Sequence, residues 1–142
     1  MKAVLDTNVL VSALIKTGKP RELLFRAAEG KFQAILSRQI LEEFVKVVRD
    51  PKVGRYVDEE DVEAFLRALA AMTSTMKVKS KFKALKRDPK DDVVLRTAYV
   101  SGSDYVVTGD RDLLEIREFR GIRIVTVERM LEIVTNEAGY GL

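Results

Sequence analysis

The chain has 142 residues, of which 46% are hydrophobic and 33% charged, and it contains no cysteine and no histidine. The absence of these two residue types excludes cysteine nucleophiles, Ser-His-Asp triads, imidazole bases and zinc sites built on Cys or His. Any catalysis must use carboxylates, hydroxyls, lysine or arginine, and carboxylates with hydroxyls are the ligands that Mg²⁺ and Mn²⁺ prefer.

The length predicts a single domain, 1–142. The chain has no long apolar run and no signal-peptide pattern, so we expect a cytoplasmic protein with no membrane association. The net charge is +3, from 25 Lys and Arg against 22 Asp and Glu. If several carboxylates gather at a metal, the remaining surface is more basic than this figure, and such a surface favours nucleic acid. The composition is also typical of thermophilic proteins.

Strand and helix patterns alternate along the chain without a domain boundary. The expected strands are 1–6, 32–36, 73–79, 104–108 and 122–126, and the expected helices are 9–15, 21–28, 38–50, 58–72, 91–100, 110–116 and 127–134. Strands separated by helices imply right-handed crossovers, so we predict an α/β fold with a mostly parallel five-stranded sheet and helices on both faces. The range 136–142 is expected to be a flexible tail.

Asp6 ends the first strand, which is otherwise apolar after Lys2. In an open α/β sheet, side chains at the carboxyl end of a central strand point into the crevice where ligands bind. The alternative is that Asp6 caps the helix that begins near Val9, a role for which Thr7 and Asn8 are also candidates.

Glu43 lies in the apolar stripe of its helix, because it shares a face with Ile40 and Val47. Its neighbour Glu42 is expected at the surface, paired with Lys46. A carboxylate that faces the core needs a cation, and a structural Arg or Lys pair is the alternative to a metal.

Asp91 is likewise expected to face the core, because it shares a helix face with Val94 and Leu95. Asp92 is instead placed for an exposed ion pair with Arg96. The alternative for Asp91 is a helix cap, since acidic residues are common in a first helical turn.

Asp110 and Asp112 follow the fourth expected strand, and an Asx-type turn is their alternative role. Asp6, Asp110 and Asp112 are then expected past strand ends on one edge of the sheet, with Glu43 and Asp91 in helices that follow such edges. Convergence of four or five carboxylates is costly unless a divalent metal neutralises them.

Four segments, in this order, resemble the PIN-domain nucleases: 5–10 (LDTNVL), 40–44 (ILEEF), 87–92 (RDPKDD) and 104–114 (DYVVTGDRDLL). The likeness is nearest to the branch of toxin components of toxin–antitoxin systems, relatives of the VapC toxins. It implies a Rossmann-like three-layer sandwich and a Mg²⁺- or Mn²⁺-dependent ribonuclease, often a homodimer, with an antitoxin that covers its groove.

The resemblance matches the four acids of the family to Asp6, Glu43, Asp91 and Asp110. It implies that Asp6, Asp91 and Asp110 hold the metal, with Asp112 as a further ligand. Glu43 would bind the metal or act as the base that orients the attacking water in phosphodiester hydrolysis.

Polar side chains beside these acids are expected to fix the carboxylate rotamers, namely Asn8, Thr108 and Thr7. The family often has an acidic residue where this chain has Lys90, so the local charge here is less negative.

A basic run before the third acid supplies the candidate RNA contacts Lys83, Lys86 and Arg87. Arg111, beside the fourth acid, is a further candidate. The alternative is a solvated loop whose lysines guard a sheet edge.

Other functional classes predict different residues at these positions. A non-catalytic RNA-binding PIN domain would be expected to lack one of the acids. A nuclease of RNA processing would instead be expected to lack the short overlapping upstream gene that accompanies a toxin. A haloacid-dehalogenase-like phosphatase would have Asp in place of Asn8, and a receiver domain would have its phosphoacceptor after the third strand. Apolar residues in excess of the core on helices 21–28 and 62–72 also favour a homodimer.

Overall fold

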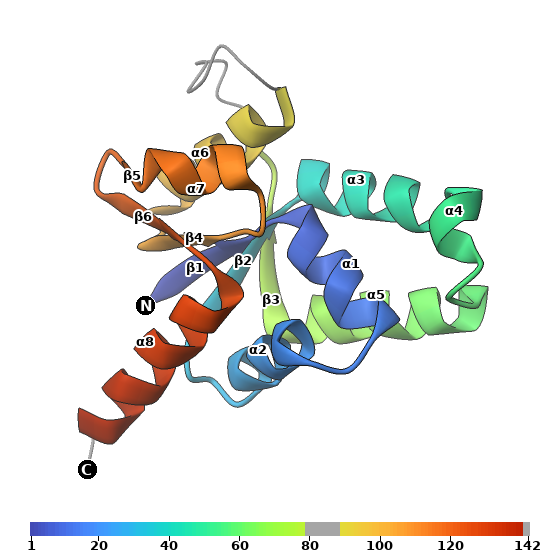
Figure 1. Ribbon diagram of the computed structural model, residues 1–142, viewed down its shortest axis with the longest axis horizontal. Coiled ribbons are helices and arrows are strands. Elements are labelled where there is room, and N and C mark those ends of the chain that lie inside the picture. Colours follow the sequence, from blue (N-terminus) through green and yellow to red (C-terminus); the bar gives the residue numbers. More distant parts are fainter. Residues whose placement is uncertain (79–88, 141–142) are drawn as a thin grey trace.

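The computed structural model describes residues 1–78 and 89–140, with the side chains of 1–78 and 92–136. One six-stranded sheet with the strand order β3-β2-β1-β4-β6-β5 runs through the molecule (Figure 1). Its strands are β1 (Lys2–Leu5), β2 (Gln33–Ser37), β3 (Thr73–Met76), β4 (Tyr105–Val107), β5 (Glu118–Phe119) and β6 (Ile122–Val125). Neighbouring strands are parallel except β5 and β6.

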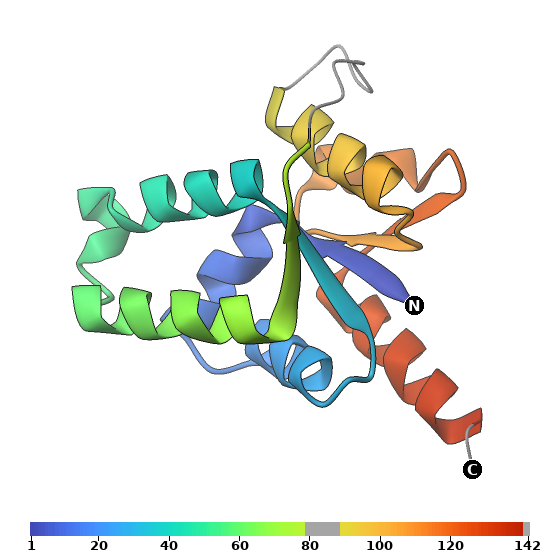
Figure 2. The ribbon, with the colours of Figure 1, turned by 180° about the vertical axis from the view of Figure 1, so that it is seen from behind.

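Helices cover both faces of the sheet. They are α1 (Thr7–Ile15), α2 (Lys19–Ala28), α3 (Arg38–Val48), α4 (Pro51–Gly54), α5 (Glu59–Met72), α6 (Pro89–Ser101), α7 (Arg111–Ile116) and α8 (Val127–Tyr140). In Figure 1, α6 and α7 lie on one side of the sheet and α2 and α8 on the other. Helices α3, α4 and α5 project from the sheet as an arm, as Figure 2 shows from behind.

The central strand β1 runs through the buried core and ends at the edge of the sheet formed by the carboxyl ends of the strands. Ala3, Val4 and Leu5 are fully buried, as expected for a strand covered on both faces. Ala3 lies opposite Ala34 of β2 and Tyr105 of β4, so the carboxyl ends of these three strands emerge at one edge. That edge carries Asp6.

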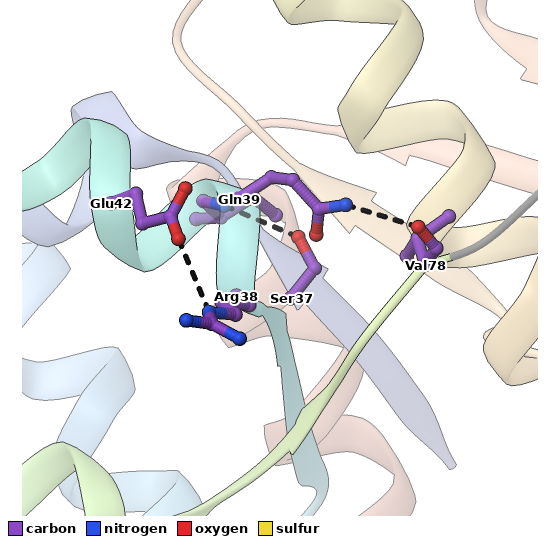
Figure 3. A network of polar contacts seen from close by, with 6 residues as sticks. Ser37, Arg38, Gln39, Glu42 and Val78 are labelled. Atoms are coloured by element: carbon purple, nitrogen blue, oxygen red, sulfur yellow. Dashed lines mark hydrogen bonds and ion pairs between the residues drawn. The ribbon is translucent and has the colours of Figure 1, made fainter.

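Helix α3 begins where β2 ends because Ser37 caps it. The Ser37 hydroxyl accepts a hydrogen bond from the Ile40 N–H at 3.2 Å, and the Gln39 side chain donates to the Val78 carbonyl at 3.0 Å. Figure 3 shows both contacts at the start of the helix. The first turn is therefore tied to the segment after β3, which fixes the position of Glu43 one turn later.

The predicted α/β fold with a mostly parallel sheet is confirmed, and the predicted five strands are corrected to six. The additional strand is β5, which pairs antiparallel with β6 at the sheet edge. Two residues are too short to show an alternating pattern, so β5 exists only through its pairing. The short helix α4 lies between the expected helices 38–50 and 58–72, and α8 runs to Tyr140, past its predicted end. No helix of the described residues is long and apolar enough to span a membrane.

Candidate active site

Asp6 lies directly after β1 and is only 8% exposed. Its N–H donates to the Val107 carbonyl at 3.0 Å, which extends the pairing of β1 with β4 by one residue. One carboxylate oxygen, Oδ1, accepts from the Thr7 N–H at 2.8 Å, so Asp6 also caps α1. The two roles considered for this residue are thus compatible, because the cap uses only one of its oxygens.

The other carboxylate oxygen of Asp6 is held by two side chains. Oδ2 accepts from the Thr108 hydroxyl at 2.7 Å and from the Asn8 amide at 2.9 Å. The Thr108 Oγ1 in turn accepts from the Asp110 N–H at 3.0 Å, and Thr108 is fully buried. Since a hydroxyl has one hydrogen to donate, Thr108 directs that hydrogen to Asp6 and orients the carboxylate.

Asn8 connects the ends of β1 and β4. Its amide nitrogen lies 3.4 Å from the Thr108 hydroxyl, and its Oδ1 accepts from the Gly109 N–H at 3.0 Å. A Cβ at Gly109 would lie 3.4 Å from the same Oδ1, which is an ordinary van der Waals contact. The segments that carry Asp6 and Asp110 are therefore joined by side-chain contacts at the carboxyl edge of the sheet.

Burial and neighbouring carboxylates raise the pKa of Asp6 above its ordinary value of 3.8. Desolvation is the largest cause, and the negative charges of Glu43 and Asp110 act in the same direction. The hydrogen bonds from Thr108 and Thr7 act in the opposite direction. Carboxylates from three different elements are thus close enough to influence one another, which is the arrangement that a bound cation relieves.

The predicted acids differ in exposure. Glu43 on α3 and Asp110 at the start of α7 are half-buried, and Asp112 is exposed in the first turn of α7. The Asp110 carboxylate accepts from the Asp112 N–H at 2.9 Å, so this aspartate also makes the turn that was its alternative role. Asp91 lies in the first turn of α6, and its side chain is outside those described.

The remaining predicted residues are placed as follows. Thr7 supplies its backbone N–H to Asp6, while its buried hydroxyl has no hydrogen-bond partner among the described residues. Arg111 is exposed beside Asp110. Lys83, Lys86 and Arg87 lie outside the described residues.

Two predictions made from helix faces are corrected: the exposure of Asp92 and the ion-pair partner of Glu42. Asp92 does pair with Arg96 at 3.2 Å, but its side chain is only 9% exposed, because α6 packs against β1, β2 and β4 as well as α3. Glu42 is at the surface as predicted, yet it pairs with Arg38 at 3.2 Å rather than with Lys46 (Figure 3). Both residues lie one turn from Glu42, so sequence spacing alone does not choose between them.

A family model described as the PIN domain matches residues 2–112. The chain belongs to the PIN-domain family. It is also 32% identical over 120 residues, 83% of this chain and 76% of the relative, to the uncharacterized protein MJ1680 of Methanocaldococcus jannaschii. PIN domains are generally nucleases that use divalent metal ions and act on nucleic acids. The matched range contains all of the predicted acids.

The carboxylate oxygens of Asp6 fit the divalent metal ions that PIN domains use. Among the described residues, Oδ1 accepts one hydrogen bond and Oδ2 accepts two, whereas a carboxylate offers about four acceptor positions. A position on Oδ1 is therefore left for a hard cation, which prefers carboxylate oxygen. The described side chains do not by themselves form a group of three acids close enough to hold an ion.

Replacing Thr108 by valine is expected to weaken Mn²⁺ binding about 10- to 100-fold, as is typical for groups that orient a metal ligand. Valine has nearly the same shape but cannot donate to Asp6, and it leaves the Asp110 N–H without its acceptor. Isothermal titration with Mn²⁺ measures the change. Thr97→Val is the matched control, because Thr97 is fully buried and donates only along its own helix, to the Val93 carbonyl. Equal Mn²⁺ affinity in both variants would contradict the role of Thr108.

The raised pKa of Asp6 predicts that the metal-free protein becomes more stable, through this group, as the pH falls. The folded state binds a proton at Asp6 more tightly than the unfolded state, so lowering the pH from neutral toward 3.8 stabilises the fold through this group. Urea unfolding in EDTA should show the stability of the wild type rising relative to Asp6→Asn as the pH falls through this window. Parallel pH profiles of the two proteins would show that Asp6 titrates alike in both states.

Proposed function

We propose that this PIN-domain protein is a Mg²⁺- or Mn²⁺-dependent endoribonuclease that hydrolyses phosphodiester bonds of single-stranded or structured RNA. The observation that carries the proposal is Asp6. This carboxylate accepts three hydrogen bonds at the junction of β1 and β4, and its burial, together with the charges of Glu43 and Asp110, raises its pKa. A fold that needed only a helix cap would not require two further acids near it.

Each residue at this edge has a part in the proposed reaction. Asp6, Asp110 and Asp91 would hold the cation, with Asp112 at the rim. When bound, the ion stabilises negative charge on the phosphate and makes a nucleophilic water available near neutral pH. Glu43, half-buried on α3, would orient the attacking water and accept its proton.

Asn8 and Thr108 hold Asp6 in one rotamer before substrate arrives, so no reorganisation is needed at the moment of reaction. Arg111 and the basic residues Lys83, Lys86 and Arg87 would contact the phosphate backbone.

The proposal is tested by incubating labelled single-stranded and hairpin RNA with the protein in Mg²⁺, Mn²⁺ or EDTA. Internal cleavage that requires the metal is expected, and a DNA strand of the same sequence shows whether the sugar is discriminated. If every RNA stays intact with both metals but still binds, the protein is a non-catalytic RNA-binding PIN domain.

We further propose that the enzyme is the toxin of a toxin–antitoxin pair. Besides the resemblance to the VapC branch, an apolar groove of about 510 Å³ between α1, α2 and α5 supports a peptide partner. Phe25 and Tyr56 line this groove and are 57% and 66% exposed. Growth arrest on induced expression of the wild type, but not of Asp6→Asn, is expected in a bacterial host. Growth without arrest would favour an RNA-processing nuclease of the cytoplasm.

We also propose a homodimer, which the resemblance to the VapC branch implies. Light scattering over a range of protein concentrations tests this: a dimer is expected, and a monomer at every concentration would overturn it.

A further inference from the structure

The turn between β5 and β6 has an unusual residue at its first position. Phe119 pairs with Ile122, which leaves Arg120 and Gly121 as a two-residue loop, and their φ angles are 50° and 86°. Two positive φ angles are typical of a type I′ turn, which favours Asn-Gly. Glycine takes this backbone readily, whereas arginine is strained in it.

A second arginine shares this feature on the other side of β5. Arg117 has a φ of 66°, and it and Arg120 are the two non-glycine residues with positive φ in the part of the chain that the structure describes. Both side chains are exposed. The two positive φ angles end α7 and close the β5–β6 turn, but neither position needs an arginine. The exposed arginine side chains are therefore the reason to look for a ligand.

The Arg120 side chain lies against two aromatic rings. Its guanidinium carbon is 5.1 Å from the centroid of Tyr99 on α6 and 5.2 Å from that of Phe119 on β5. Tyr99 is 49% exposed, and the adjacent Val100 is 44% exposed. We call Tyr99, Phe119 and Arg120 the arginine–aromatic surface. A planar cation beside an exposed tyrosine and a half-buried phenylalanine is the kind of surface on which nucleobases stack.

Two helices connect this surface to the proposed active site. Helix α7 begins at the Asp110 cap and ends next to Arg117, and its six residues span about 9 Å. Helix α6 carries Asp91 in its first turn and Tyr99 near its end. A short single strand that leaves the carboxylates can therefore run along these helices to the arginine–aromatic surface.

We propose that the arginine–aromatic surface binds a base of single-stranded RNA outside the cleaved phosphodiester bond. The identification of the ligand as RNA rests on the proposed function, whereas the surface itself is independent of the carboxylates. Exposed Glu115 and Glu118 lie in the same stretch as the two arginines, so stacking, rather than net positive charge, supplies the attraction. Binding through this surface should be tolerant of sequence, because every base has a stacking face.

The test is fluorescence anisotropy with a labelled single-stranded RNA in EDTA, where cleavage cannot occur. Arg120→Asn is expected to weaken binding about tenfold, a typical effect of losing one stacking contact. Its melting temperature should be equal to or above that of the wild type, because Asn is preferred in this turn. The slope of log affinity against log salt should change by less than about one, the value for one phosphate contact.

Two further variants sharpen the result. Arg120→Lys keeps the charge but not the planar group, so it should bind as weakly as Arg120→Asn. Arg67→Gln on α5 is the matched control, because Arg67 is also an exposed arginine, and it should bind like the wild type. Full affinity in Arg120→Lys would mean that charge alone acts, and would overturn the stacking proposal.

Two other results would overturn the proposal, and a third would separate it from the proposed function. If Arg120→Asn binds like Arg67→Gln but is less dimeric in sedimentation, the surface is a contact between copies of the chain. If it melts far below the wild type, Arg120 is needed for the hairpin itself. If the wild type binds RNA through Arg120 yet never cuts it with metal, the proposed function fails and this inference stands.

Discussion

Replacing Asp6 by asparagine is expected to lower the rate of RNA cleavage by at least about 10²- to 10³-fold, the scale of losing one group that stabilises charge in a transition state. Asparagine is nearly isosteric with aspartate but carries no charge, so it removes the buried ligand without opening a cavity. RNA binding should persist. Stability without metal should change little, because one hydrogen bond at the amide is lost while the repulsion by Glu43 and Asp110 is relieved.

The matched control for this substitution is Asp104→Asn. Asp104 lies at the opposite end of β4, is exposed, and accepts a hydrogen bond from the Lys2 N–H at 2.9 Å. Single-turnover cleavage of labelled RNA in Mn²⁺, with circular dichroism of both variants, provides the comparison. Cleavage at the wild-type rate by Asp6→Asn would show that this carboxylate is only a helix cap.

Phe44→Ala is expected to cost about 3–5 kcal/mol of unfolding free energy, the usual range for truncating a buried phenylalanine. Phe44 is fully buried on α3, and its ring centroid lies 5.4 Å from that of Phe65 on α5. Since whole domains are stable by only about 5–15 kcal/mol, this loss is a large fraction of the total. Cleavage should fall too, because the adjacent Glu43 is positioned by the same helix.

Urea unfolding measures this loss, and Phe25→Ala provides the control. Phe25 is 57% exposed, and truncating it should cost much less than truncating Phe44. A similar loss in both variants would mean that Phe25 is buried in solution, as it would be if a second copy of the chain filled the groove. A small loss in Phe44→Ala would show that the arm of α3, α4 and α5 contributes little to the stability of the sheet.

Apart from α4 and β5, the sequence by itself determined the elements and their order, because these depend on local patterns. The apolar run before Asp6 predicts β1, Ser37 predicts the start of α3, and the helical spacing around Phe44 predicts its buried face. It also predicted that Asp6, Glu43 and Asp110 would converge, since parallel strands place their carboxyl ends at one edge. Of these three, Glu43 and Asp110 do act on the pKa of Asp6.

The tertiary structure alone decided which atoms meet. The Thr108 hydroxyl reaches Asp6 across 102 residues of sequence, and Gly109 donates to Asn8 across 101. The burial of Asp92 likewise depends on β1, β2 and α3, which are far from it along the chain. Arg120, in the turn between β5 and β6, rests on Tyr99 of α6 and has a backbone conformation that sequence preference would assign to asparagine. Such contacts carry no local signal, because they arise only when distant segments pack together.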